Sequence, residues 1–111
     1  MKTILVLLVT LLLPLTTFAA PVTLLDCHLN SWHVEWASIS YYNGNLFLLT
    51  KPADGDFTSQ IIDEKQWEYR IIAIANTPDL KGILYKKEGQ WFFAFKDSSG
   101  WSSSGNASCS E

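Results

Sequence analysis

Hydrophobic and polar residues alternate over several short stretches of this chain, a period typical of β-strands. In "QWFFAFK" (90–96), Trp91, Phe93 and Phe95 alternate with Phe92 and Ala94, so both faces are apolar and the strand should lie in the middle of a sheet. The last three predicted strands follow one another through short connections, which indicates an antiparallel sheet. Strands are predicted at 22–29, 46–50, 57–62, 66–76, 82–87 and 90–96, and the Ser/Gly-rich tail that returns to the second cysteine is expected to be a loop.

The stretch 30–45 fits two periods, and the helical one is preferred. Trp32, Trp36 and Ile39 follow the i, i+4, i+7 spacing of one apolar helix face. Asn30 or Ser31 would supply the oxygen that caps the first turn. A helix over 31–42 is therefore predicted to pack through these three residues on a sheet of 67–75, 82–87 and 90–96.

The competing interpretation of the same stretch is a β-hairpin. Trp32, Val34 and Trp36 alternate as in a strand, but Ser38 and Ser40 then fall on the same face. Asn43-Gly44 is a hairpin signal as well as a plausible helix stop. With the helix chosen, the predicted fold class is α+β, with one helix packed on a small antiparallel sheet.

The N-terminus has the pattern of an export signal. Lys2 precedes an apolar run too short to span a bilayer comfortably, and small residues stand at Thr17 and Ala19. Residues 1–19 are therefore predicted to be a signal peptide and 20–111 a single secreted domain, with an uncleaved anchor as the alternative.

Two cysteines, Cys27 and Cys109, lie near the two ends of the predicted mature chain. In an exported domain of this size they are expected to form one disulfide, although free thiols or an intermolecular bond remain open. Closing a loop of 82 residues would contribute about 4.5 kcal/mol on the chain-entropy account. His28 and His33 are interpreted as ordinary residues, and no metal site or cofactor is expected.

Charge limits the class of partner. Without Lys2 the chain has 7 basic against 11 acidic side chains, a net charge of about −4. No basic cluster exceeds the pair Lys86-Lys87, and such a domain is poorly suited to holding a phosphate backbone. The aromatic content of 14% is interpreted as core rather than as a ligand platform.

The order of "LLDC", "QWEYRI" and "KGILYKKEGQWFFAFKDSSGWSSSGNASC" resembles that of the fungal guanyl-specific ribonucleases and the ribonuclease-like secreted effectors of powdery mildew fungi. The resemblance implies a ribonuclease-like fold and places Glu68 at the position of the family's general base. Lys96 stands at the position of the histidine acid, and Lys81 or Gly82 at that of an arginine. A lysine stays protonated until about pH 10 and is a poor acid near neutrality. Glu68 is thus a relic, or simply a solvent-facing strand residue paired with Lys86 or Lys87.

The resemblance leads to an expected function. The chain would be a catalytically inactive secreted fungal effector that is monomeric and not bound to a membrane. It would be delivered into plant cells, where it would promote virulence by binding host proteins, with weak binding of RNA as a second expected interaction. The alternatives are an active guanyl-specific ribonuclease and a periplasmic lysozyme-inhibitor-like protein of bacterial origin. The stretch "SSGWSSSGN" is faintly similar to the Ser/Gly-rich inhibitory loop of such inhibitors. An inhibitor of that type would be all-β at 31–42. Asn106 begins an N-glycosylation sequon.

Overall fold

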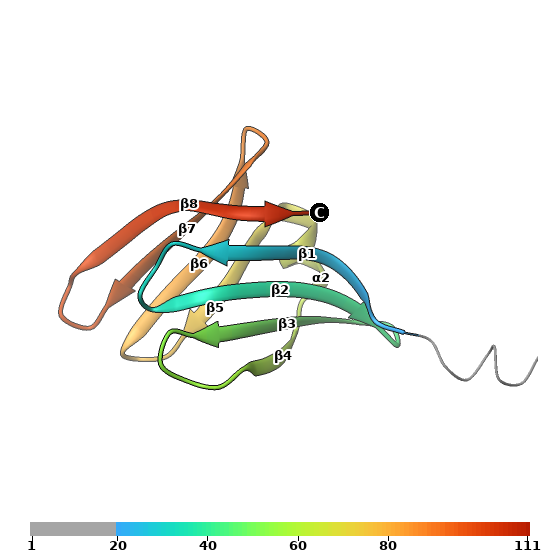
Figure 1. Cartoon of the computed structure of the whole chain (residues 1–111), viewed down its shortest axis with the longest axis horizontal. Helices are drawn as coiled ribbons and strands as arrows, with labels where there is room; N and C mark the ends of the chain where they lie inside the picture. The colour runs from blue at the N-terminus through green and yellow to red at the C-terminus, as the bar shows by residue number, and fades with distance from the viewer. Residues whose placement is uncertain (1–19) are drawn as a thin grey trace, which may run out of the picture.

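The computed structural model describes residues 20–111, so the predicted signal peptide lies outside the described residues. The chain forms one antiparallel sheet of eight strands, curled into a half-barrel, with strand order β4-β3-β2-β1-β8-β7-β6-β5 (Figure 1). A short helix, α2, joins the two edge strands. The elements are β1 Val22–Leu29, β2 Val34–Tyr42, β3 Asn45–Pro52, β4 Thr58–Ile62, α2 Glu64–Tyr69, β5 Ile71–Asn76, β6 Leu80–Lys87, β7 Gln90–Asp97 and β8 Ser102–Ser110.

The predicted helix over 31–42 is wrong, and with it the α+β, ribonuclease-like fold class. Residues 34–52 form the β2–β3 hairpin, which turns at Asn43 (φ 52°) and Gly44 (φ 83°). Left-handed backbone at both turn residues matches the twist of a two-residue hairpin. The pairing of β2 with β3 shifts between Val34 and Trp36. Because this bulge breaks the alternation of inward and outward positions, the sequence resembled a helix face at this point.

The predicted long strand 66–76 is also wrong in its first part. Residues 64–69 form α2, whose N-cap Asp63 accepts a hydrogen bond from the backbone N–H of Lys65 at 3.0 Å. Arg70 ends the helix in the left-handed conformation (φ 57°). Its guanidinium lies 3.9 Å from the centre of the Trp67 ring. This capped turn places the strand start at Ile71, and Glu68 consequently lies on a helix.

Several other elements agree with the sequence analysis. The strands predicted at 22–29, 57–62, 82–87 and 90–96 are present as β1, β4, β6 and β7, within one or two residues. The predicted middle position of 90–96 is confirmed, since β7 lies between β6 and β8. The tail expected to be a loop is instead the nine-residue strand β8.

The core lies on the concave face of the single sheet. Trp91, Phe93 and Phe95 point inward from β7 and are almost completely buried. Two glycines on the neighbouring strands leave room for these rings: Gly82 of β6 is opposite Phe95, and Gly105 of β8 is opposite Phe93. The remaining buried apolar side chains come from β1 to β6, namely Leu25, Cys27, Leu29, Val34, Ala37, Ile39, Leu46, Leu48, Ile62, Ile72, Ile74 and Leu84.

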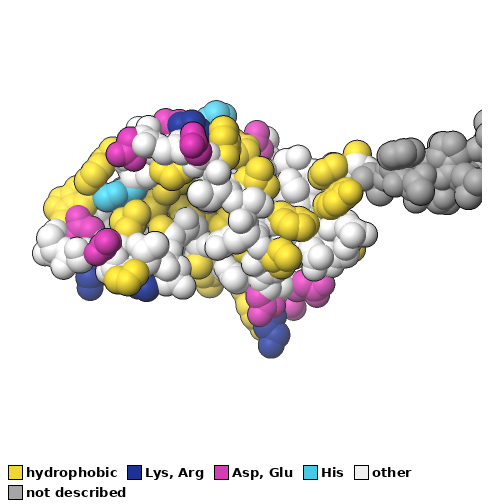
Figure 2. All heavy atoms as spheres, turned by 90° about the horizontal axis from the view of Figure 1, so that it is seen from below, with side chains coloured by type: hydrophobic (Ala, Val, Ile, Leu, Met, Phe, Trp, Pro, Cys, Tyr) yellow, Lys and Arg dark blue, Asp and Glu magenta, His cyan; other side chains and the backbone are white. Residues whose placement is uncertain are grey.

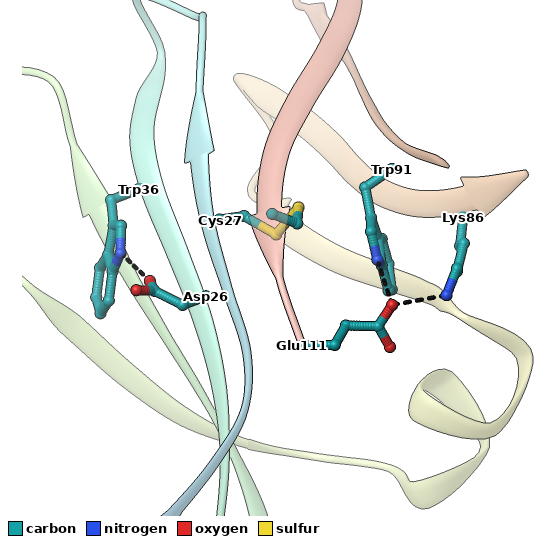
Figure 3. Close-up of a disulfide and its surroundings, with 7 residues drawn as sticks. Asp26, Cys27, Trp36, Lys86, Trp91 and Glu111 are labelled. Atoms are coloured by element: carbon teal, nitrogen blue, oxygen red, sulfur yellow. Dashed lines mark hydrogen bonds and ion pairs between the residues drawn. A yellow bond between two sulfur atoms is a disulfide. The ribbon is translucent and has the colours of Figure 1, made fainter. Parts of the chain in front are cut away.

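The predicted disulfide between Cys27 and Cys109 is confirmed, and it lies at the seam between β1 and β8 (Figure 3). The seam joins the two four-stranded halves of the sheet through only four residue pairs. The cysteines are direct partners in this ladder, with Cα atoms 4.1 Å apart. Beside the seam, Glu111 pairs with Lys86 at 2.6 Å, and this hydrogen bond from Lys86 is the main cause that lowers the pKa of the Glu111 carboxyl.

Candidate functional site

The topology gathers four connections at one end of the half-barrel. Because neighbouring strands run in opposite directions, the loops 30–33, 53–57, 77–79 and 98–101 all lie on the same side, and the strand order makes them neighbours (Figure 1). We call this set of loops the loop end. Backbone hydrogen bonds join two pairs of loops: Ala53 N–H donates to His33 O at 3.3 Å, and Ser98 N–H donates to Asp79 O at 3.1 Å. The opposite end carries α2 and the turns at 43–44 and 88–89.

An aromatic cluster, defined as Trp32, His33 and Trp101, lies at the centre of the loop end. The Trp32 ring is 3.9 Å from the His33 ring and 5.5 Å from the Trp101 ring, measured between centroids. His33 also contacts the core, 5.3 Å from the ring of Phe95. Trp32 is nevertheless 65% exposed and Trp101 45% exposed. Two indoles that are supported from below and open to solvent form a surface suited to binding.

The position of Trp101 is fixed by the turn that follows β7. The carboxylate of Asp97 accepts hydrogen bonds from the Ser99 hydroxyl at 2.6 Å, from the Ser99 N–H at 3.0 Å and from the Trp101 N–H at 3.0 Å. The hydrogen bond from the Ser99 side chain is the largest cause that lowers the pKa of Asp97, and the backbone hydrogen bonds from Trp101 and Ser99 add to it. Asp97 is therefore ionised at neutral pH, and it holds Trp101 in place before any partner arrives.

His33 is held from its backbone. Its N–H donates to the Ser31 hydroxyl at 3.1 Å, and its carbonyl accepts from Ala53. Its Nε2 atom is buried and has no hydrogen-bond partner among residues 20–111. A buried polar atom without a protein partner is unfavourable unless water satisfies it, so His33 is placed here at a cost in free energy.

The charge of the loop end is negative. Its loops contain Asp54, Asp56 and Asp79, with Asp97 at the end of β7, and the four loops contain no lysine or arginine. Seen from below, the surface shows hydrophobic side chains around a hollow, with both acidic and basic side chains near its rim (Figure 2). Exposed indoles and carboxylates together favour a cationic partner, because indole faces attract ammonium and guanidinium groups.

The two residues that the resemblance placed at the positions of the family's base and acid are not brought together. Glu68 is exposed on α2, and with Glu64 it borders an open, mostly apolar hollow of about 530 Å³ at the end opposite the loop end. Lys96 lies at the other end of the sheet, on the outer face of β7 in register with Lys81. Neither lysine predicted as a partner of Glu68 pairs with it: Lys86 pairs with Glu111, and no ion pair of Lys87 is found among residues 20–111. Glu68 thus has no acid partner among the described residues placed for a joint proton transfer.

We therefore predict that the purified protein does not cleave guanylyl-cytidine dinucleotide above background. Replacing Glu68 by Gln should leave any residual signal unchanged, since general-base catalysis requires hydrogen-bond reach to one proton and a matching acid. Chromatography for the cyclic phosphate product measures this. Turnover that Glu68→Gln removes would contradict the prediction.

The other sequence candidates stay separate as well. Asn106 is exposed on β8 opposite Phe92, and its glycosylation remains a prediction. His28 of β1 is the cross-strand partner of Trp36 of β2, on the same face of the sheet. In the described part of the chain, no group of three metal-binding side chains is found.

Sequence reasoning missed the aromatic cluster because it assigned the aromatic residues to the core. Trp32 was placed on the packed face of a helix, whereas the structure exposes it in a loop. A usable signal was nevertheless present: Trp32 follows Asn30-Ser31, and Trp101 follows "DSSG". A tryptophan within a run of turn formers is more often exposed than one within an alternating apolar run.

Within residues 20–111 no helix has the length and apolar character needed to cross a bilayer. Comparison with known proteins adds no relative: no family model, no curated protein and no solved structure matches the chain.

Proposed function

We propose that the mature chain is an exported, non-catalytic binding protein of the lysozyme-inhibitor type, which binds a basic lysozyme through the loop end. The observation that carries this proposal is the exposed Trp32–Trp101 pair, held by the Asp97 turn at an end of the sheet whose loops contain Asp54, Asp56 and Asp79. Tryptophan is among the residues that contribute most to protein–protein affinity, and acidic surroundings accelerate encounter with a basic partner.

The all-β course of residues 34–52 supports this class over the ribonuclease-like one. A lysozyme inhibitor would be all-β at 31–42, whereas the ribonuclease resemblance required a helix there. The expectation of a host-directed effector rested on that fold, so it is not carried into the proposal. What the two expectations share, an exported protein that acts by binding another protein, is retained. A similar fold does not by itself establish function, so the proposal depends on the site.

The test is inhibition of cell-wall hydrolysis by lysozymes. Purified, disulfide-bonded protein comprising residues 20–111 is titrated against lysozymes of the c, goose and invertebrate types, and its affinity for any lysozyme it inhibits is measured by calorimetry. We expect Trp32→Ala to weaken binding by at least about tenfold, because an exposed indole at the centre of an interface typically contributes more than about 1 kcal/mol. Affinity should also fall as salt is raised, since the attraction is between surface charges.

The matched control is Tyr69→Ala. Tyr69 is as exposed as Trp32, at 66% against 65%, but it lies on α2 at the opposite end of the molecule. Its loss should leave affinity unchanged. The proposal fails if none of the lysozymes is bound, or if Tyr69→Ala weakens binding as much as Trp32→Ala does. Far-UV circular dichroism checks that each variant is folded.

A further inference from the structure

The two edges of the sheet are protected unequally. The strands β4 and β5 form the edges and do not pair with each other. The edge of β5 is covered by α2, where the side-chain carbonyl of Gln66 accepts a hydrogen bond from the Ala73 N–H at 2.9 Å. In the described part of the chain, the backbone of β4 bonds only to β3. The β5 edge is therefore partly satisfied within the fold, whereas the β4 edge presents unpaired N–H and C=O groups.

The sequence of β4 lacks the features that usually protect an edge strand. "TSQII" (58–62) contains no charged residue and no proline. Ile61 is 63% exposed, and Phe57 just before the strand is 59% exposed. Natural sheets discourage edge pairing with lysine, proline or bulges. A bare, partly apolar edge beside a protected one is suited to receiving another strand.

Charges at the two ends of β4 decide what kind of strand fits. Asp56 precedes the strand, and Asp63 and Glu64 follow it. A second copy of the chain, paired antiparallel about Gln60, would bring Asp56 close to the other copy's Asp63, where α2 begins, at both ends of the contact. Like charges placed opposite each other oppose strand pairing, so a second copy is disfavoured.

We infer that the free edge of β4 binds an extended segment of a basic partner protein by strand addition. The segment would have a basic residue near each end, to face Asp56 on one side and Asp63 and Glu64 on the other. Its backbone would supply the missing hydrogen bonds, and alternate side chains would cover Ile61. With β4 five residues long, the complementary segment has about seven residues. This site is separate from the aromatic cluster used in the proposed function, although the loop 53–57 leads directly into it.

The experiment uses synthetic peptides and the protein comprising residues 20–111, without any lysozyme. The probe is a capped peptide of sequence KTVTVTK, and the comparison peptide is ETVTVTE. Calorimetry at low salt should show the lysine-ended peptide binding at least about tenfold more tightly. Ile61→Lys should weaken this binding by at least about tenfold, because it places a charge on the edge. The matched control, Ile71→Lys, adds the same charge to the covered edge strand β5, where the wild-type residue is 53% exposed, and should have no effect.

Three outcomes would overturn the inference. They are failure of the lysine-ended peptide to bind, equal binding of both peptides, and equal loss of binding in both lysine variants. A concentration-dependent dimer that Ile61→Lys disrupts would show that a second copy occupies the edge instead. Amide hydrogen exchange of residues 58–62 with and without peptide locates the contact, since strand addition should slow the exchange of β4 and leave β5 unchanged.

Discussion

Removing the disulfide, as the double variant Cys27→Ala/Cys109→Ala, should lower the free energy of unfolding by roughly 4–5 kcal/mol. The bridge closes a loop of 82 residues, and the chain-entropy relation gives about 4.5 kcal/mol for that length. A domain of this size has about 5–15 kcal/mol in total. The loss should be concentrated at the seam, because only four residue pairs join β1 to β8 without it. Denaturant unfolding at neutral pH measures the change.

The control distinguishes the effect of losing the covalent bond from the effect of replacing the two cysteine side chains. The wild-type chain, with its bridge reduced by a phosphine, contains every original atom except the sulfur–sulfur bond and two added hydrogens. It should show most of the same loss, whereas the alanine variant adds a small cavity at the fully buried Cys27. A loss below about 1 kcal/mol in both forms would show that the seam is stable without the covalent link. If the double variant does not fold, circular dichroism of the reduced wild type still gives the comparison.

Replacing Gly82 by alanine should destabilise the protein by about 1–3 kcal/mol, the usual cost of an extra carbon in a packed core. A Cβ atom at this position would lie 2.4 Å from Cε1 and 2.5 Å from Cδ1 of Phe95, and 3.3 Å from the Cβ of Ala75. Phe95 is 2% exposed and lies beneath the sheet, so its ring has little space to move into. The melting temperature should fall by roughly 4–8 °C for each kcal/mol lost.

The matched control is Gly55→Ala in the loop 53–57. There an added Cβ would meet only Pro52 atoms at 3.5 Å, an ordinary contact distance. This variant should unfold close to the wild-type temperature. Gly82→Ala should destabilise the Phe95→Leu variant less than it destabilises the wild type, because the smaller leucine side chain makes room for the added methyl group. Equal stability of the Gly82→Ala and Gly55→Ala variants would contradict the steric account.

Most of the strands and the disulfide could be predicted from the sequence. β1, β6 and β7 are found where the alternation of apolar residues placed them, and Cys27 pairs with Cys109 as expected. Both predictions need little knowledge of the tertiary structure. A period of two residues is visible within six residues, and two cysteines in one small domain have only one internal pairing.

The candidate site could not be predicted in the same way. Trp32 and Trp101 are 69 positions apart, and they meet because β1 and β8 are neighbours in the sheet. The resemblance to ribonucleases instead directed attention to Glu68 and Lys96, which the fold places at opposite ends of the sheet. The sequence showed the turn formers around both tryptophans but not which of the loops would lie together.

The sequence by itself therefore determined the positions of β1, β3, β4, β6 and β7 and the covalent link, and it marked Asn43-Gly44 as a place where an element ends. Only the tertiary structure decided whether residues 34–42 form a helix or a strand. Their spacing fits both periods, and the fold resolves the choice by a bulge that turns Ala37 and Ile39 toward the core, where strands β1 and β3 satisfy the backbone on both sides. Burial against partners distant in the chain can outweigh local periodicity, because the free energy of packing an apolar face exceeds the small propensity differences between helix and strand.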